Sequence, residues 1–214
     1  MIKKFGIILA ASALCLVGSG GLQSRTGSDD MFVTDIDGNR YRAVSIGDQV
    51  WMAENLKVTK TGEGEPVESF FYEDDEEQYG RLGRLYKWEA AMNGSRAEES
   101  RGIAPDGWHI PSAEEWRTLF RHLEKNGISG RELLKNGKTG FDALLEGGAD
   151  FRGNYLYLGT YSMFWSSTET NDERALHFGV DKDGSLDEFA AMKGARIAVR
   201  CIKNSPEESE RSMK

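Results

Sequence analysis

The 214-residue sequence is poor in cysteine, proline and histidine, of which it has two, four and three. Two cysteines cannot build a disulfide-stapled scaffold, so the fold depends on an apolar core. Positive charge is also scarce, because 27 Lys and Arg face 35 Asp and Glu, for a formal net charge of −8. This balance argues against nucleic-acid binding and against a basic membrane-surface protein.

Long apolar runs are absent after the first residues of the chain. The longest run, Phe5 to Val17, is interrupted only by Gly6 and Ser12. A transmembrane helix needs about 20 apolar residues, so we expect no transmembrane span in the mature chain. What the sequence does have is 39% hydrophobic residues, 25 glycines and five tryptophans. This composition predicts one folded domain with many tight turns around a tryptophan-rich core.

The N-terminus has the pattern of an export signal. Lys3 and Lys4 precede the apolar run, and the small residues 18–21 follow it. We expect residues 1–19 to be a signal peptide, 20–30 a linker, 31–203 the folded domain and 204–214 a flexible tail. The protein would then be secreted, periplasmic or on the cell surface. Lipid anchoring at Cys15 is an alternative, although Leu14 stands where a lipobox has a small residue.

The order of the predicted elements is typical of an α+β fold. Strands come first, helical segments lie in the middle, and strands return towards the C-terminus. We predict early strands over 31–36, 40–46 and 49–52, a helix over 85–92, and late strands over 155–158, 162–167, 174–180, 185–190 and 195–202. In the last of these, alternation places Ile197, Val199 and Cys201 on one face and Arg196, Ala198 and Arg200 on the other.

The clearest helix starts after Ser112. Ser112 and Glu115 form a capping box. Apolar residues follow at helical spacing, namely Trp116, Leu119, Phe120 and Leu123. Asn126-Gly127 predicts the end of this helix. A second capping box, Ser129 with Glu132, predicts a short helix that stops at Asn136-Gly137.

Seven short motifs occur in a recognisable order. They are Asp35-Ile-Asp-Gly-Asn39, Gln49-Val-Trp-Met-Ala-Glu-Asn-Leu56, Gly83-Arg-Leu-Tyr-Lys-Trp88, Pro105-Asp-Gly-Trp-His-Ile-Pro111, Glu115-Trp116, Phe164-Trp-Ser-Ser167 and Val199-Arg-Cys201. Together they resemble the Fibrobacter succinogenes major paralogous domain, found in exported bacterial proteins. The resemblance covers about residues 31–203.

The resemblance implies a C-type-lectin-like fold, related to the formylglycine-generating enzyme family. This fold has loop-rich mixed sheets, two or three helices in the middle of the chain, and paired N- and C-terminal strands. The family pattern also implies a cysteine where this chain has Ala104, so Cys201 lacks its expected partner. The family's function is poorly defined, and the resemblance therefore implies a fold more than an activity.

A tyrosine-rich stretch is the candidate ligand surface. Tyr155, Tyr157 and Tyr161 lie near Asn154 in a segment that is rich in glycine. Aromatic rings flanked by Asn and Asp can hold a glycan by stacking on the sugar faces. Tyrosine is also a good strand residue, so a structural role stays open.

Calcium is the one cofactor that the sequence raises, at Asp181, Asp183 and Asp187, whose oxygens alternate along the chain. A complete EF-hand loop is missing, and a hairpin turn at Asp183-Gly184 explains the same pattern. The acidic run 73–77 offers carboxylates too, with a solvated loop as the alternative. We expect no other cofactor.

Catalytic motifs are not evident. Cys201 could act with His109 or His177 in thiol catalysis, but we interpret it as a buried thiol on the inward face of a strand. We interpret His109 as a core residue whose ring bonds to the backbone, with a pocket residue as the alternative. Cys201 and the five tryptophans are assigned structural roles: Trp51, Trp88, Trp108, Trp116 and Trp165.

These observations favour an exported, non-catalytic recognition module that binds a polysaccharide or a protein at the bacterial cell envelope. One alternative is a structural or adhesive envelope protein without a small ligand. A third is an enzyme of unknown chemistry. The oligomeric state stays open.

Overall fold

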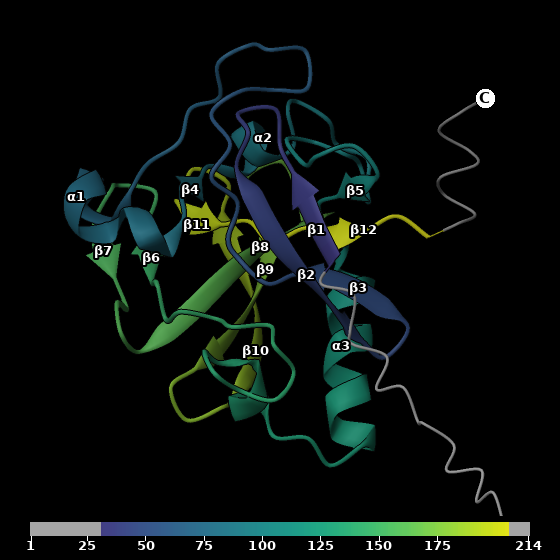
Figure 1. The fold of residues 1–214 in the computed structure, drawn as a ribbon. Coiled ribbons are helices and arrows are strands. Elements are labelled where there is room, and N and C mark those ends of the chain that lie inside the picture. Colours follow the sequence, from purple (N-terminus) through teal and green to yellow (C-terminus); the bar gives the residue numbers. More distant parts are fainter. Residues whose placement is uncertain (1–30, 206–214) are drawn as a thin grey trace, which may run out of the picture.

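The fold was analysed in a computed structural model, which describes residues 31–205. The predicted signal peptide, the linker, Cys15 and the tail beyond Ser205 lie outside the described residues. Over the described range, no helix is both long and apolar enough to cross a membrane. The element order confirms the α+β class, with strands at both ends and helices between them (Figure 1).

Three sheets and three short α-helices make up the described part of the chain. The strands are β1 (Met31–Thr34), β2 (Arg40–Ile46), β3 (Gln49–Met52), β4 (Leu85–Tyr86), β5 (Trp108–His109), β6 (Gly148–Ala149), β7 (Tyr155–Leu156), β8 (Tyr161–Glu169), β9 (Arg174–Asp181), β10 (Leu186–Met192), β11 (Ile197–Ala198) and β12 (Ile202–Lys203). The helices are α1 (Glu76–Tyr79), α2 (Trp88–Ala91) and α3 (Ala113–Lys125), with 3-10 turns at Tyr72–Asp74, Gly80–Leu82 and Gly130–Leu133.

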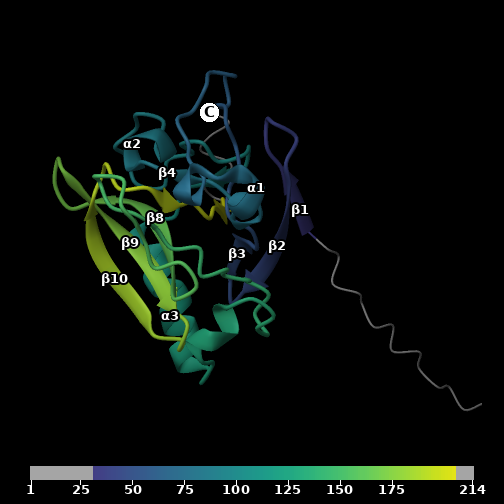
Figure 2. The same ribbon diagram turned by 90° about the vertical axis from the view of Figure 1, so that its left-hand side faces the viewer.

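Two five-stranded sheets hold the molecule together. Their strand orders are β1-β2-β3-β12-β5 and β10-β9-β8-β11-β4, and β6 and β7 form a separate pair. Strands β1–β3 and β8–β10 lie on opposite sides of the molecule in Figure 2. The last strand joins the N-terminal sheet, where Ile202 pairs with Trp51. The C-terminal strand thus joins the sheet of the N-terminal strands, although its neighbours are β3 and β5 and not β1.

The C-terminal strand is divided between the two sheets, so the prediction of one strand over 195–202 was wrong. β11 pairs with β8 and β4, whereas β12 pairs with β3 and β5. Between β11 and β12 the backbone forms hydrogen bonds with the segment 52–56. The carbonyls of Val199 and Cys201 accept from the amides of Leu56 and Met52, respectively. The segment therefore crosses from one sheet to the other through the middle of the protein.

Both faces of this crossing segment are buried. Val199 and Cys201 belong to one core cluster, and Ala198 and Ile202 belong to a second. Arg200, which alternation assigned to the face opposite Cys201, has no exposed surface. Sequence alternation gave the correct faces, but it could not show that a second core covers the charged one.

Arg200 is accommodated by a polar network inside the core. Its Nη2 donates to Oδ1 of Asn55 at 2.5 Å, and Nη1 donates to the carbonyl of Phe141. The guanidinium carbon lies 4.3 Å from the centre of the Phe141 ring. Burial lowers the pKa of Arg200 to about 10, while the charge of buried Glu146 opposes this change. Without such partners a buried cation would be costly.

Helix α3 matches its prediction. Ser112 and Glu115 form the capping box, and Trp116, Leu119 and Leu123 are buried. The Trp116 ring stacks on Phe164 and lies 4.5 Å from the Trp51 ring. Helix α3 thus joins the two sheets through Trp116.

The other helix predictions were partly wrong. Residues 85–92 begin as strand β4, because Tyr86 pairs with Ile197 of β11, and only Trp88–Ala91 is helical. The second capping box gives a single 3-10 turn in which Ser129 accepts from the Arg131 amide. At residues 85–86, pairing with β11 overrides the local helix preference. At residues 130–133, the segment is too short to form a stable α-helix.

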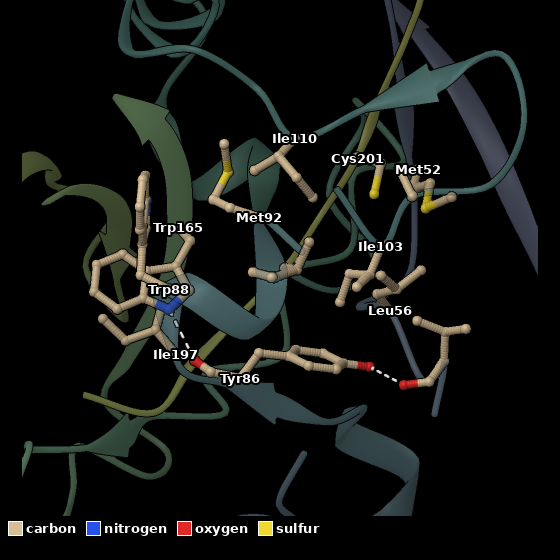
Figure 3. Close-up of a cluster of buried hydrophobic side chains, with 14 of the residues drawn as sticks. Met52, Leu56, Tyr86, Trp88, Met92, Ile103, Ile110, Trp165, Ile197 and Cys201 are labelled. Carbon is tan, nitrogen blue, oxygen red and sulfur yellow. Dashed lines mark hydrogen bonds between the residues drawn. The ribbon is translucent and has the colours of Figure 1, made fainter. Parts of the chain in front are cut away.

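All five tryptophans lie in the core, each at most 6% exposed. The indole nitrogens of Trp88 and Trp165 donate to the carbonyls of Ser166 and Tyr86, both at 2.8 Å. Figure 3 shows the Trp88 and Trp165 rings beside Tyr86, with Cys201 in the same cluster. Satisfied indole nitrogens allow these large rings to be buried at little polar cost.

Candidate functional site

The predicted tyrosine surface is divided into two unequal parts. The first part is engaged within the protein. Tyr155 packs against Tyr72, with ring centres 4.9 Å apart, and its hydroxyl accepts from Arg196 at 2.8 Å. The Asn154 side chain donates to Asp150 at 2.8 Å and closes a turn. Contacts within the fold thus account for both side chains.

The second part faces outwards. Tyr157 is 57% exposed, and its backbone φ is 67°, in the left-handed region. A bulky residue seldom adopts this conformation, and such strain is a pointer to function. The Tyr157 ring contacts Tyr161 edge-on, with ring centres 6.2 Å apart. Tyr157 and Tyr161 therefore form a pair at the start of β8.

Tyr161 is the first residue of β8 and lies on the face of β8, β9 and β10 that is opposite to Phe164 and Phe178. We call this the outer face. On this face, Trp165, His177 and Phe189 lie directly across the three strands from one another. The His177 ring centre is 6.3 Å from that of Trp165 and 6.0 Å from that of Phe189. Trp165 is fully buried, His177 is 7% exposed and Phe189 is 55% exposed. The row therefore runs from the core to the surface, with His177 beneath Phe189.

A second row carries negative charge. Asp187 pairs with Gly179, where a Cβ atom would meet the Tyr161 hydroxyl at 2.4 Å. The Tyr161 ring therefore lies across Gly179. Burial raises the pKa of the Tyr161 phenol, and the carboxylates of Asp187 and Asp181 raise it further. We call Tyr157, Tyr161, His177, Asp187 and Phe189 the aromatic face.

Tyr157 and Tyr161 were predicted for a ligand surface and Asp187 for a metal site, and the structure brings all three to one face. His177 and Phe189, which also lie on this face, were not predicted as binding residues. Part of the signal was present, because Asp187 and Phe189 lie two residues apart in β10 and therefore share one face of it. Without the register between the strands, the faces of the separate strands could not be combined into one surface.

His177 is the unusual member of the aromatic face. Its Nδ1 is buried and has no hydrogen-bond partner among the residues that the structure describes. Burial lowers the pKa of His177 to about 4, so the ring is neutral near pH 7. Buried polar groups are normally paired. An unpaired nitrogen beneath a half-exposed ring is a group that a ligand could satisfy.

The aspartates of the β9–β10 turn serve the turn itself. Asp181 Oδ1 accepts from the amides of Asp183 and Ser185, both at 2.8 Å. These backbone bonds lower the pKa of Asp181. Asp183 pairs with Arg131 at 2.9 Å. Over residues 31–205, no three His, Cys, Asp or Glu side chains form a group that could hold a metal ion, and calcium stays a prediction.

The acidic run 73–77 is folded back on the protein. Asp75 caps helix α1 by accepting from the Gln78 amide at 3.0 Å. Asp74 lies 3.4 Å from Arg196, which stacks on the Phe70 ring at 3.7 Å. A turn and an ion pair therefore account for part of the run without a cation.

His109 is buried, and its two ring nitrogens lie within hydrogen-bond distance of side chains. Nε2 lies 2.9 Å from Glu115 and Nδ1 lies 2.8 Å from Asn204. Glu115 and Asn204 line a pocket of about 330 Å³, together with Gln49 and Ser205. Glu115 also accepts from the Ser112 amide in the capping box. The same carboxylate therefore caps α3 and anchors His109.

Cys201 is fully buried, and burial raises the pKa of its thiol well above the usual range. A thiol in such surroundings is a poor nucleophile. Ala104 belongs to the same core cluster as Cys201. We expect a cysteine introduced at position 104 to form a disulfide with Cys201 under oxidising conditions.

Comparison with known protein families gives a match over most of the chain. The family model of the Fibrobacter succinogenes major domain matches residues 44–203. This range contains all of the aromatic face and six of the seven motifs, and the remaining motif, 35–39, precedes it. No curated protein and no solved structure matches the chain.

Proposed function

The chain belongs to the Fibrobacter succinogenes major domain family, and we propose that it is an exported, non-catalytic recognition module with a C-type-lectin-like fold. Its ligand would be a polysaccharide at the bacterial cell envelope, bound on the aromatic face. The observation that carries this proposal is Tyr157, a half-exposed ring in the left-handed region beside Tyr161.

The composition of the face favours a polysaccharide over a protein ligand. Large exposed rings beside a carboxylate suit a sugar, which offers an apolar face for stacking and hydroxyl groups that donate to the carboxylate. The cores of protein interfaces are instead depleted in Asp and Glu. Asp187 lies between Tyr161 and Phe189 on this face, as their strand register shows.

A glycan array probed with the purified protein tests the proposal. We expect binding to at least one polysaccharide, and loss of that binding on Tyr157→Ala. The matched control is Phe32→Ala, which removes a 44% exposed ring from β1, in the other large sheet. Binding to no glycan, or equal losses in both variants, would refute a glycan site at Tyr157.

Export is tested separately by intact-mass analysis of the protein from its native host. We expect residues 1–19 to be missing from the mature chain, or a lipid attached at Cys15 if the alternative holds. A full-length protein in the cytoplasm would refute export. It would leave the array result unaffected.

A further inference from the structure

The aromatic face carries negative charge and a hidden polar nitrogen. The carboxylates are Asp187, which is partly exposed, and Asp181, which is held in the turn. Asp187 pairs with Gly179, over which the Tyr161 hydroxyl lies, so its carboxylate is near the centre of the face. Both carboxylates raise the pKa of the Tyr161 phenol. A chain with a net charge of −8 adds further negative charge. Anionic polymers would therefore be repelled from the aromatic face.

The Phe189 ring lies beside the His177 ring, whose Nδ1 is buried. Phe189 is 55% exposed, and its ring is tilted 38° to the His177 ring, with centres 6.0 Å apart. Phe189 lies on β10, which is an edge strand of its sheet. In the described structure, β10 pairs with β9 on one side and with no strand on the other. A rotation of this half-exposed side chain would uncover the imidazole without disturbing the core that Trp165 belongs to.

We propose that the aromatic face selects uncharged polysaccharides, and that His177, uncovered when Phe189 turns, forms a hydrogen bond with a sugar hydroxyl. This inference rests on the proposed function and adds two things to it: the charge class of the ligand and a specificity-determining residue. Stacking on Tyr157 and Phe189 provides contact with any sugar face. His177 and Asp187 provide the polar contacts that set the orientation of the sugar.

The unpaired Nδ1 is what separates His177 from an ordinary core histidine. His109, which is also buried, has Asn204 and Glu115 within hydrogen-bond distance of its two nitrogens. Nδ1 of His177 has no such partner among the described residues, and the residue is only 7% exposed to solvent. A bound hydroxyl would complete its hydrogen bonding, as a partner normally does for buried polar groups.

The test compares affinities for neutral and anionic polymers. The purified protein is run in gels that contain a neutral β-glucan, mannan or xylan, or polygalacturonate as the anionic probe. We expect retardation by a neutral polymer and none by polygalacturonate. His177→Phe, which keeps a flat ring and removes both nitrogens, should weaken binding at least tenfold. Asp187→Asn, which changes a partly exposed carboxylate, should weaken it severalfold, and Phe32→Ala should have no effect.

A spectroscopic readout separates contact from a structural role. Long-range ¹H–¹⁵N spectra should show the Nδ1 resonance of His177 moving as the neutral polymer is added. Retardation by polygalacturonate alone would overturn the charge class. Wild-type affinity in both His177→Phe and Asp187→Asn, or an unmoved Nδ1 resonance during binding, would overturn the role of His177. In either case a glycan signal on the array that depends on Tyr157 would leave the proposed function standing.

Discussion

The two faces of strands β8, β9 and β10 differ in how their aromatic side chains are used. On the inner face, Phe164 and Phe178 stack against Trp116 of α3, with ring centres 5.5 and 5.8 Å apart. Both phenylalanines are at most 1% exposed. On the outer face, Phe189 is half exposed and its ring contacts that of His177, whose Nδ1 has no partner among the described residues.

This difference shows what each face contributes. The inner face has rings in near-parallel contact and a capped helix over them, which is the arrangement that stabilises a fold. Each face holds one buried ring nitrogen without a hydrogen-bond partner in the described structure, Trp116 Nε1 on the inner face and His177 Nδ1 on the outer face. The outer face adds the half-exposed Phe189 ring and Tyr157 in the left-handed region, a conformation that costs stability. Departures from local structural rules are expected at functional sites, and this is why we propose the outer face as the binding surface.

Trp116 provides the largest expected effect and tests the inner face. Trp116→Ala should lower the free energy of unfolding by roughly 3–5 kcal/mol, because it empties an aromatic core site. The two sheets would lose the ring that contacts both Trp51 and Phe164. Urea denaturation measures the change. An unchanged midpoint would contradict the packing described for α3.

His177 links the outer face to pH. Its pKa is about 4 in the folded protein and about 6.5 when unfolded, so the unfolded state binds more protons between these values. Stability should therefore be lost as pH falls from 6.5 to 4, by roughly 3 kcal/mol in total for this residue. Urea midpoints at pH 7 and 4.5 should differ less in His177→Phe than in the wild type. Equal pH dependence in both proteins would argue against a buried, neutral His177.

The α3 cap should have a smaller effect. Ser112 accepts from the Glu115 amide and donates to Glu99. Ser112→Ala should cost about 1 kcal/mol through loss of the N-cap. Thermal unfolding followed by circular dichroism measures this change. A variant as stable as the wild type would mean that Glu115 alone is sufficient to cap α3.

Tyr157 should respond in the opposite way from a core residue. Tyr157→Gly removes a side chain from a position with positive φ, where glycine fits without strain. We expect stability to be unchanged or raised by up to about 1 kcal/mol, and polysaccharide binding to be lost. Denaturation and gel retardation of the same preparation give both values. A marked loss of stability would assign Tyr157 to packing.

The sequence was sufficient for local features. The α3 cap and stripe, the hairpins of β1–β3 and the burial of the tryptophans follow from short patterns, because neighbouring residues determine them. The Leu85–Tyr86 strand and the division of residues 195–202 depend on pairing between distant parts of the chain. Tyr86 pairs with Ile197, which lies more than 80 residues further along the sequence. No local pattern could have shown these pairings.

The candidate site was predicted only in part for the same reason. Tyr157 and Tyr161 were visible as a tyrosine cluster, and Asp187 was visible as an acidic residue after a turn. His177 and Phe189 joined them only through the register of three strands. Tyr155 had the same local context as Tyr157, yet contacts with Tyr72 and Arg196 bury much of it.

Phe189 tests the central claim, that the outer face of β8–β10 binds a polysaccharide, most directly. Phe189→Ala should change the free energy of unfolding by no more than about 0.5 kcal/mol, since the ring is half exposed. The measurement is the affinity of Phe189→Ala and Phe32→Ala for the same neutral polysaccharide. We predict at least tenfold weaker binding for Phe189→Ala and wild-type affinity for Phe32→Ala, whereas equal affinities for the two variants would contradict the claim.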